Sequence, residues 1–378
     1  LTELQNIIIG VRDTAVAKIE AYNNSNGDGV TAPVPVLQDY WDAGVTGVRS
    51  ANLDAVNARI LALAKDQADT KIEIQNVVNA NNIAYDAALE LIFKAARDNH
   101  FNAGEVDLLV YETIGIQKLS AENFKQINAL LLSPNVTGAH VANAEQIQQL
   151  VTSYFTIQQV AADTSGEAPL PEWADYNAIG VVVDNDPQVM QLLTQVIDGS
   201  STAQVETQAK IQQFADTVKA VMSVAAGGSG DFSAAELIAL GLTKVTANNL
   251  ATIKAQIANT ADDGSAVDTL DELQTLITKV ETDAVAFIEA YNRGNGTDPA
   301  ALAAQDYWNA GIDSVTSANL QLVNAAILSR EANGADSKSK IVTVIDNAIT
   351  ALAAIKIAAD TTNGAVERSD FEDIGLTV

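Results

Sequence analysis

The stretch QDYWDAGVTGVRSANLDAVNARIL runs from Gln38 to Leu61, and QDYWNAGIDSVTSANLQLVNAAIL runs from Gln305 to Leu328. The two stretches align without a gap, although 267 positions separate their first residues. So close a match indicates duplication inside the chain. Internal repeats decide a fold class when they are present, because each repeat is one unit that buries its apolar face against its neighbours.

A shorter motif recurs along the whole chain: an aromatic or apolar residue, two variable residues, a small or apolar residue, a glycine and an apolar residue. It is written YWDAGV, YETIGI, YNAIGV, LIALGL, YWNAGI and FEDIGL, with the glycines at Gly44, Gly115, Gly180, Gly241, Gly311 and Gly375. Successive glycines are 71, 65, 61, 70 and 64 residues apart. The chain therefore carries a degenerate repeat of about 65 residues.

Helical periodicity fills each repeat. Apolar residues stand 9, 12 and 16 positions after the glycine, as at Leu53, Val56 and Ile60, and this spacing marks one face of an α-helix. We expect the glycine to end a short helix in the left-handed conformation. Just before the helix that follows, near the N-cap position where a short side-chain oxygen can accept backbone N–H groups, stand Ser50, Ser120, Asp184, Thr246 and Thr316.

A longer helix is expected to close each repeat, over 70–98, 144–163, 207–228, 270–294 and 339–360. Only IGVVVDN, residues 179–185, resembles a strand, and it aligns with the link that follows the glycine in the other copies. The predicted fold class is all-α, with tandem degenerate three-helix repeats of about 65 residues stacked into an elongated array.

The predicted organisation follows from this alignment. A long helix over 1–30 completes a preceding unit, five helical repeats cover 31–100, 101–165, 166–228, 229–297 and 298–362, and residues 363–378 start a further unit. Residues 1–27 match 270–296, so copies four apart are more alike than neighbours. We expect the natural polypeptide to continue beyond one or both ends; the alternative is that neighbouring copies complete the partial units.

Composition restricts the partners. With 48 acidic and 21 basic residues the net charge is −27, which disfavours binding to nucleic acid and to anionic membranes. There is no cysteine, so disulfides and thiolate chemistry are excluded. No apolar run is expected to approach the roughly 18–20 residues that span a bilayer, so no membrane insertion is expected in this segment.

No catalytic arrangement stands out. The two histidines, His100 and His140, lie in different repeats without counterparts, and we expect both on the surface. The glycine-rich loops lack the motifs that bind phosphates, and there is no nucleophile elbow. The chain is therefore expected not to be an enzyme and to have no cofactor, calcium being the one candidate.

The calcium candidates come from two polar loops. Asn24, Asn26 and Asp28, followed by Gly29, resemble the first half of an EF-hand loop, in which alternate oxygens bind calcium, and Asp298 lies in the related loop RGNGTD. Pro35 stands where the bidentate acid of such a loop belongs. A solvated turn is the preferred interpretation.

Aromatic residues hold fixed places before the glycines. They could form a carbohydrate-binding platform, but their regular position favours core packing. The residues concerned are Tyr40, Trp41, Tyr111, Tyr176, Tyr307, Trp308 and Phe371.

Asp39–Leu61, Asp306–Leu328 and, less closely, residues 241–257 (GLTKVTANNLATIKAQI) follow the pattern DY-x-x-AG-[VI]-T-x-V-[ST]-x-x-NL-x-x-VN-x-x-[IL]. This pattern resembles the alanine- and aspartate-rich helical repeats of very large surface proteins of Gram-negative, often marine, bacteria, which are repetitive adhesins exported by type I secretion. The segment 175–230 departs most from it. The resemblance implies an extracellular, cell-surface location and a spacer or adhesive array, and it names no ligand.

Three functions are open. The leading hypothesis is a non-enzymatic structural or adhesive repeat region of a larger bacterial surface protein, whose partners are adjacent repeats or a host, biofilm or other surface ligand. The alternative is a self-assembling subunit of an extracellular filament or surface layer, whose partners are other copies of itself. The third is a module that binds glycans or peptides in grooves between repeats.

Overall fold

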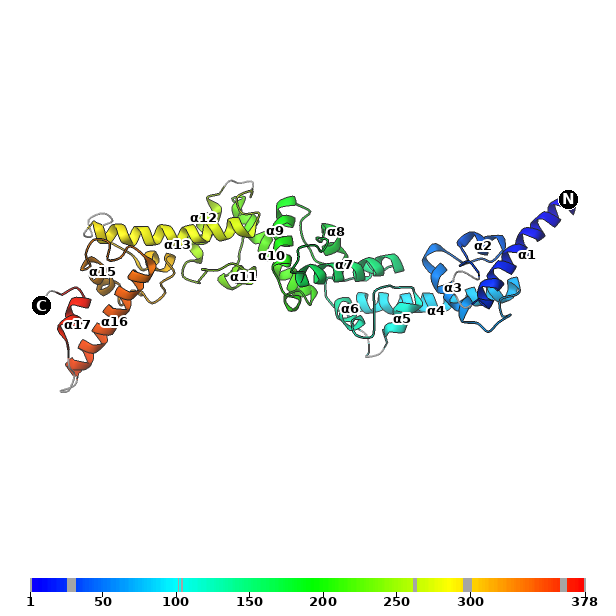
Figure 1. Ribbon diagram of the computed structural model, residues 1–378, viewed down its shortest axis with the longest axis horizontal. Coiled ribbons are helices and arrows are strands. Elements are labelled where there is room, and N and C mark those ends of the chain that lie inside the picture. Colours follow the sequence, from blue (N-terminus) through cyan, green and yellow to red (C-terminus); the bar gives the residue numbers. More distant parts are fainter. Residues whose placement is uncertain are drawn as a thin grey trace. The chain divides into compact units, whose positions relative to one another are not determined.

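The computed structural model describes residues 2–25, 32–100, 102, 105–260, 264–294, 301–360 and 366–376, without the side chains of Ala51 and Asp360 (Figure 1). Within these ranges the chain forms helices joined by turns and contains no β-strand. The predicted all-α class is confirmed. The strand-like stretch 179–185 is a link without regular structure, as its alignment with the other copies predicts.

The chain divides into two compact units. Unit 1 comprises Leu1–Val183 and Ser201–Gln212, and unit 2 comprises Asp184–Ser200 and Gln213–Val378. The division falls inside the predicted repeat 166–228.

Unit 1 contains long, medium and short α-helices and three 3₁₀-helices among its described residues. In chain order they are α1 (Thr2–Asn24), α2 (Leu37–Asp42), the 3₁₀-helix η1 (Ser50–Asn52), α3 (Leu53–Ala62), α4 (Lys71–Asp98), α5 (Leu108–Thr113), α6 (Phe124–Leu131), η2 (Gly138–His140), α7 (Ala144–Ala162), α8 (Trp173–Ala178) and η3 (Thr202–Gln204), with the start of α10 (Gln208–Ala225).

Unit 2 contains the rest of α10 and eight further α-helices among its described residues. They are α9 (Pro187–Asp198), α11 (Ala234–Ala239), α12 (Leu250–Ala258), α13 (Leu270–Arg293), α14 (Ala304–Asn309), α15 (Leu320–Leu328), α16 (Lys338–Asp360) and α17 (Arg368–Asp373). The predicted long helices α4, α7, α10, α13 and α16 all form, with ends within three residues of those expected.

Two hydrophobic cores, one in each unit, are built from corresponding residues. The first core contains Ala15, Val16, Ile19, Tyr22, Ala32, Tyr40, Ala43, Val45, Val48, Val56, Ile60, Ala68, Ile74 and Val78. The second core contains Ala284, Ile288, Tyr291, Leu302, Tyr307, Ala310, Ile312, Val315, Val323, Ala326, Ile327, Ala335, Ile341, Val344, Ile345 and Ala348. Each core uses the end of one long helix, a short helix, a medium helix and the start of the next long helix.

A long helix can therefore serve two cores. In α13 the residues Leu273, Ile277 and Val280 are buried in the half against which α12 packs. Further along the same helix, Ile288 and Tyr291 belong to the second core, where α14 and α15 pack (Figure 1). In unit 1, α4 does the same: its first half enters the first core and its second half packs against α5 and α6.

The six aligned glycines are left-handed, as predicted. Their φ angles are +71° at Gly44, +80° at Gly115, +71° at Gly180, +97° at Gly241, +71° at Gly311 and +82° at Gly375. The N–H after each glycine donates to the carbonyl five residues earlier, for example Val45 to Tyr40 and Ile312 to Tyr307, both at 2.9 Å. This is the Schellman pattern of helix ends. Glycine is favoured at these positions because a side chain strains this conformation.

The residues expected near the helix N-caps lie two or three positions before the caps themselves. The residue directly before the medium helix is Asn52, Asn123, Asp186, Asn249 or Asn319. The expected residues Ser50, Ser120, Thr246 and Thr316 lie earlier because a tight turn separates the link from the helix. In the third copy Asp186 caps α9, accepting hydrogen bonds from the N–H groups of Gln188 and Val189, and the expected Asp184 forms an ion pair with Lys219.

The aromatic residues divide into two groups. Tyr40, Tyr111, Tyr176 and Tyr307 are fully buried, so the prediction of core packing is confirmed for them. Trp308 and Phe371 are half-buried, and the Trp308 indole donates to the Val315 carbonyl at 2.8 Å. The prediction is wrong for Trp41, which is 57% exposed because it points away from the face of α2 that carries Tyr40.

Helix α16 corrects the expectation that no membrane-length apolar run exists. Its segment Lys338–Ala359 is long and apolar enough to cross a membrane by length and composition, a test that core helices of soluble proteins also pass. In the structure Ile341, Val344 and Ile345 of this helix lie in the second core.

Two of the aligned glycines offer a matched test. Alanine at Gly115 would meet no heavy atom within 4 Å, whereas a Cβ at Gly180 would lie 2.7 Å from the Asn135 carbonyl oxygen. We expect Gly115→Ala to lower the free energy of unfolding by about 1–2 kcal/mol, through the left-handed conformation alone. Gly180→Ala should cost about 1 kcal/mol more, because backbone must also move. Urea denaturation followed by circular dichroism measures both, and equal costs would contradict the close approach at Gly180.

Candidate functional site

The polar contacts that recur along the chain lie where helices and links meet. The first of these is an asparagine clamp on the link after four of the six aligned glycines, formed by Asn52, Asn123, Asn249 and Asn319. Each Oδ1 accepts the N–H three residues earlier, at 2.7–2.8 Å. Each Nδ2 donates to the carbonyl five residues earlier, at 2.9–3.0 Å.

The clamp offsets backbone strain. The carbonyls held by Asn123 and Asn249 belong to Lys118 and Lys244, which have φ angles of +69° and +65°. A left-handed conformation costs a residue with a Cβ roughly 1–2 kcal/mol. The two hydrogen bonds of the asparagine fix this turn and aim the chain into the medium helix.

The second contact is a buried tyrosine–asparagine pair. The hydroxyls of Tyr40, Tyr111 and Tyr307 donate to Oδ1 of the asparagine 17 residues later, at 2.6, 2.7 and 2.8 Å. Those residues, Asn57, Asn128 and Asn324, donate in turn to the carbonyls of Pro35, Val106 and Leu302 at 2.7–2.9 Å. The pair thus ties the short helix, the medium helix and the loop before them.

Burial keeps these tyrosines in the donating form. Desolvation raises the pKa of Tyr40, Tyr111 and Tyr307 well above the ordinary value of 10. Neighbouring tyrosine and aspartate charges raise the pKa of Tyr40 and Tyr307 further. A buried asparagine oxygen needs such a donor, because an unsatisfied buried polar group costs about 1–3 kcal/mol.

The fourth copy replaces both members of the pair together. Leu237 stands in place of the tyrosine and is fully buried, and Lys254 stands in place of the asparagine. The Lys254 ammonium lies 4.5 Å from the centre of the Phe232 ring and 3.3 Å from the Asp231 carboxylate. The paired change leaves neither a buried hydroxyl nor a buried amide without its partner.

The third contact is a glutamine fork between the link and the start of the next long helix. In Gln75 the amide oxygen accepts the Thr46 N–H and the amide nitrogen donates to the Thr46 carbonyl, both at 2.9 Å. Gln148, Gln212 and Gln274 hold Gln117, Val182 and Thr243 in the same way, at 2.6–3.5 Å. Each fork fixes the residue two positions after an aligned glycine.

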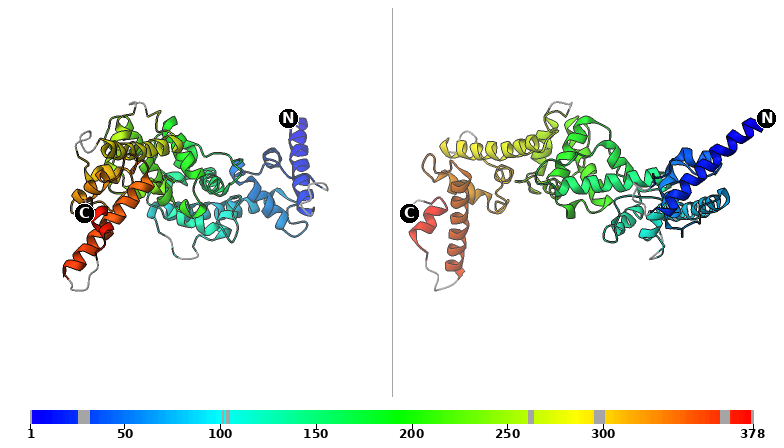
Figure 2. Two further views of the ribbon diagram at one scale, coloured as in Figure 1. Left: turned by 60° about the vertical axis from the view of Figure 1, so that its left-hand side comes forward. Right: turned by 45° about the vertical axis from the view of Figure 1, so that its right-hand side comes forward.

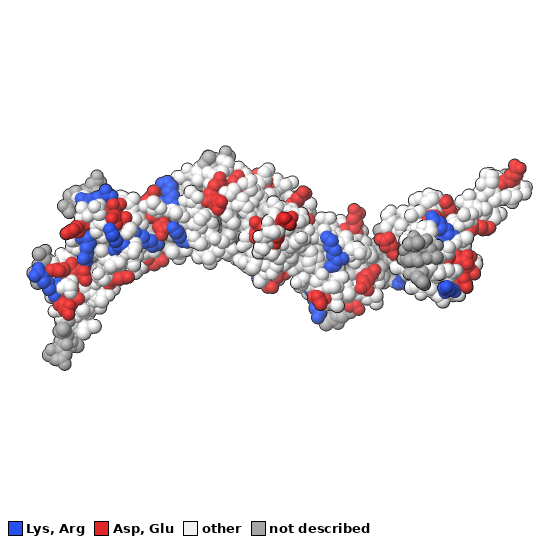
Figure 3. Space-filling view, viewed as in Figure 1, with Lys and Arg blue, Asp and Glu red and all other residues white. Residues whose placement is uncertain are grey.

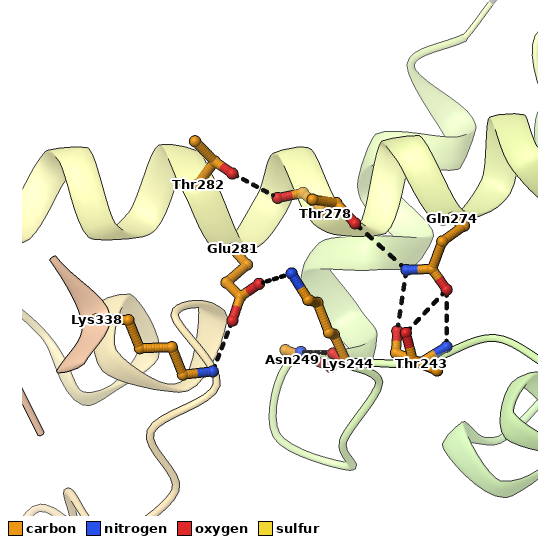
Figure 4. A network of polar contacts seen from close by, with 8 residues as sticks. All are labelled: Thr243, Lys244, Asn249, Gln274, Thr278, Glu281, Thr282 and Lys338. Atoms are coloured by element: carbon orange, nitrogen blue, oxygen red, sulfur yellow. Dashed lines mark hydrogen bonds and ion pairs between the residues drawn. The ribbon is translucent and has the colours of Figure 1, made fainter.

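The fourth contact occurs on α13, between the halves that serve different cores. The Glu281 carboxylate, with a side chain only 13% exposed, is paired with Lys244 from the link before α12 and with Lys338 at the start of α16 (Figure 4). The Lys338 Nζ lies 2.6 Å from Oε1 of Glu281. Burial acts to raise the pKa of Glu281, but the two ammonium groups outweigh it and the pKa is lowered. Glu281 therefore stays ionised and joins three helical segments.

The calcium candidates have no common site in the described residues. The Asn24 side chain exchanges two hydrogen bonds with Asp66, donating to its carboxylate at 3.1 Å and accepting its N–H at 3.0 Å. Asn26, Asp28 and Asp298 lie outside the described residues. Among the residues that are described, no three His, Cys, Asp or Glu side chains are grouped to hold a metal ion.

The two histidines occupy local surface positions. His100 is exposed after the end of α4. His140 is half-buried in η2, where its Nδ1 lies 3.0 Å from the Thr137 nitrogen and accepts its N–H. These positions agree with the expectation of surface histidines.

One hollow on the surface of unit 2 is open to solvent. It has a volume of about 460 Å³ and is lined by the Asp184–Lys219 ion pair, Met222 and Gly264 among other residues. The ion pair spans 3.0 Å, and both of its side chains are more than half exposed. A solvated pair of this kind gives no water-excluded place for catalysis.

Comparisons with family models, with curated proteins and with solved structures find no match to this chain.

None of these four polar contacts is among the predictions made from the sequence. The asparagine clamp and the tyrosine–asparagine pair recur at fixed distances from the aligned glycines, so a comparison of the copies could have found them. The glutamine fork could have been found in the same way. Glu281 carries no such signal, because Arg12 occupies its position in the matching helix α1.

Glu281 gives a pH-dependent prediction. Because its pKa is lowered in the folded state, the pairing stabilises the fold above the ordinary value of 4.5 and is lost as the pH falls through the folded pKa. We expect Glu281→Gln to lower the free energy of unfolding of unit 2 by about 1 kcal/mol at pH 7, since both lysines are partly exposed. The difference from the unsubstituted chain should disappear below pH 4.5.

Asp283→Asn is the matched control for Glu281→Gln. Asp283 pairs with Lys279 on the same helix, but both side chains are more than 60% exposed. Thermal denaturation at pH 7 and at acid pH should show little change for this variant. An equal loss in both variants would show that the two-lysine arrangement has no special effect.

Proposed function

We propose that the chain is a tandem array of small helical repeats and serves as a non-enzymatic spacer or adhesive region of an extracellular bacterial surface protein. Three recurrences support the array: the left-handed glycines of all six copies, the glutamine forks of the first four copies, and the asparagine clamps of four copies, the third having Asp186 instead. The short, medium and long helices between them also repeat in the same order.

The single observation that carries this proposal is the sharing of α13. One half of this helix is buried against α12, and the other half is part of the second core. A helix used in this way couples each core only to the next one, which is the nearest-neighbour arrangement of repeat proteins. Length can then grow by adding units, without any change to the cores already present.

A spacer or adhesive role suits such an array better than catalysis does. The recurring polar side chains form hydrogen bonds within the fold, between links and helices. Repetition of the unit increases the length and the surface area of the chain. The acidic side chains are spread over the face seen in Figure 3, and with a net charge of −27 they keep the chain in solution and hold other anionic surfaces away. The resemblance to secreted bacterial repeats supports the extracellular location in this proposal.

Small-angle X-ray scattering tests the array. A compact globule of 378 residues has a radius of gyration of about 21 Å. We expect a value well above this, with a distance distribution that has a long tail. Measurements over a dilution series remove any contribution from association. A radius near that of the globule would overturn the proposal.

A further inference from the structure

Helix α4 carries a polar stretch at its centre, between the two groups of helices that it serves. Ile74 and Val78 lie in the first core, and Tyr85, Ala88 and Ile92 are buried further along the helix. The helix passes from the blue part of unit 1 to its cyan part, where α5 and α6 pack on it (Figure 1, Figure 2). The stretch between Val78 and Tyr85 is thus the part of α4 that joins one repeat to the next.

In the middle of this stretch Asn81 is buried without a hydrogen-bond partner. The residue is 0% exposed, and neither its Oδ1 nor its Nδ2 is bonded to any described residue. Counted from the glutamine of each fork, the same position holds Tyr154, Val218 and Val280 in α7, α10 and α13. The valine side chains have no polar atom, and the Tyr154 hydroxyl donates to the Glu206 carbonyl at 2.8 Å. Of these four helices, α4 is therefore the one with an unpaired amide at this position.

The sequence around this amide is also unfavourable for a helix. Four of the seven residues 76–82 are asparagine, whereas the corresponding stretches of α7, α10 and α13 contain none. Asparagine is among the weaker helix formers, because its side chain competes for backbone hydrogen bonds. No charged residue stands between Glu73 and Asp86, so ion pairs one turn apart cannot support the helix here.

The matching part of α13 is held by an ion-pair arrangement that α4 lacks. Glu281 pairs with Lys244 of its own copy and with Lys338 of the next copy, so it spans the junction of the two repeats (Figure 4). Asn82 stands at the position of Glu281. Its side chain donates to the Gly47 carbonyl at 3.1 Å, and this carbonyl belongs to the same copy as Asn82.

Two further contacts tie the fourth copy to the fifth. Asp313 accepts a hydrogen bond from the Asn248 side chain at 2.8 Å, and Gln305 donates to the Asn248 carbonyl at 2.9 Å. In the second copy, Gln117 and Leu109 take the positions of Asp313 and Gln305. Gln117 bonds within its own copy, and the Leu109 side chain is 65% exposed and has no hydrogen-bonding group.

We propose that the centre of α4 is a flexible joint, at which residues 76–84 open locally while the helices packed on both sides stay folded. Because the described residues offer the Asn81 amide no partner, water must supply its hydrogen bonds, and opening of the helix gives water access. Glu281 and the contacts of Asn248 keep the matching part of α13 closed. The inference rests on the proposed array of shared long helices: successive repeats reorient at α4 and stay fixed at α13, without loss of either core.

Hydrogen exchange of the full chain measures the opening. Relative to unstructured peptides of the same sequence, we expect residues 76–84 to exchange at least about tenfold faster than residues 275–283. Asn81→Val should slow exchange at α4 by about tenfold, because it removes the unpaired amide and supplies the residue found in α10 and α13. The matched control is Asn76→Val, since Asn76 is exposed and the two residue types have similar helix propensity. This control should leave exchange unchanged.

Two results would overturn the joint. Equal protection of residues 76–84 and 275–283 in the unsubstituted chain would show that the Asn81 amide is satisfied inside a closed helix. An equal effect of Asn81→Val and Asn76→Val would show that the buried amide is not the cause of opening. Failure of the joint is distinguishable from failure of the array: an extended chain in scattering with a well-protected α4 would overturn only the joint.

Discussion

Burial of an apolar stripe that is longer than one medium helix is the constraint on which the rest of the structure depends. In α13 the buried residues run from Leu273 to Tyr291, a length of about 27 Å. Helices α12 and α15 have nine residues each and are about 14 Å long. One medium helix therefore cannot cover the stripe, and two are needed in succession. This requirement makes a long helix the shared element of two cores.

The polar contacts fix the position and rotation of each helix, which burial of the apolar stripe does not determine. Apolar packing alone tolerates a helix that slides or rotates by a turn, whereas an asparagine or glutamine amide with two partners does not. The clamps and forks lie next to the ends of helices, where backbone groups lack partners inside the helix, and the tyrosine–asparagine pairs join the short helix to the middle of the medium helix. The fourth copy changes both members of the tyrosine–asparagine pair, to Leu237 and Lys254, whereas the third copy keeps Tyr176 and has Leu193 at the asparagine position.

The sequence predicts the helices well because their signals are local. The long helices show a sustained period, and the aligned glycines meet a steric requirement that other residues satisfy only with strain. The sequence does not identify the residue directly before most medium helices, because serine and threonine oxygens stand close to the same turn. An asparagine side chain closes that turn. The prediction of core packing fails for Trp41 because this residue follows Tyr40 directly, and adjacent residues of a helix point to different sides. Glu281 could not be predicted, since its partners come from two segments far away in the chain.

Independence of the cores is the central claim, and hydrogen exchange of a core variant tests it most directly. Val323 is fully buried in the second core, so Val323→Asp should unfold that core. Mass spectrometry of peptides should then show loss of amide protection across residues 284–348, with protection of residues 15–78 unchanged. Loss of protection in both regions together would show one cooperative globule and contradict the account.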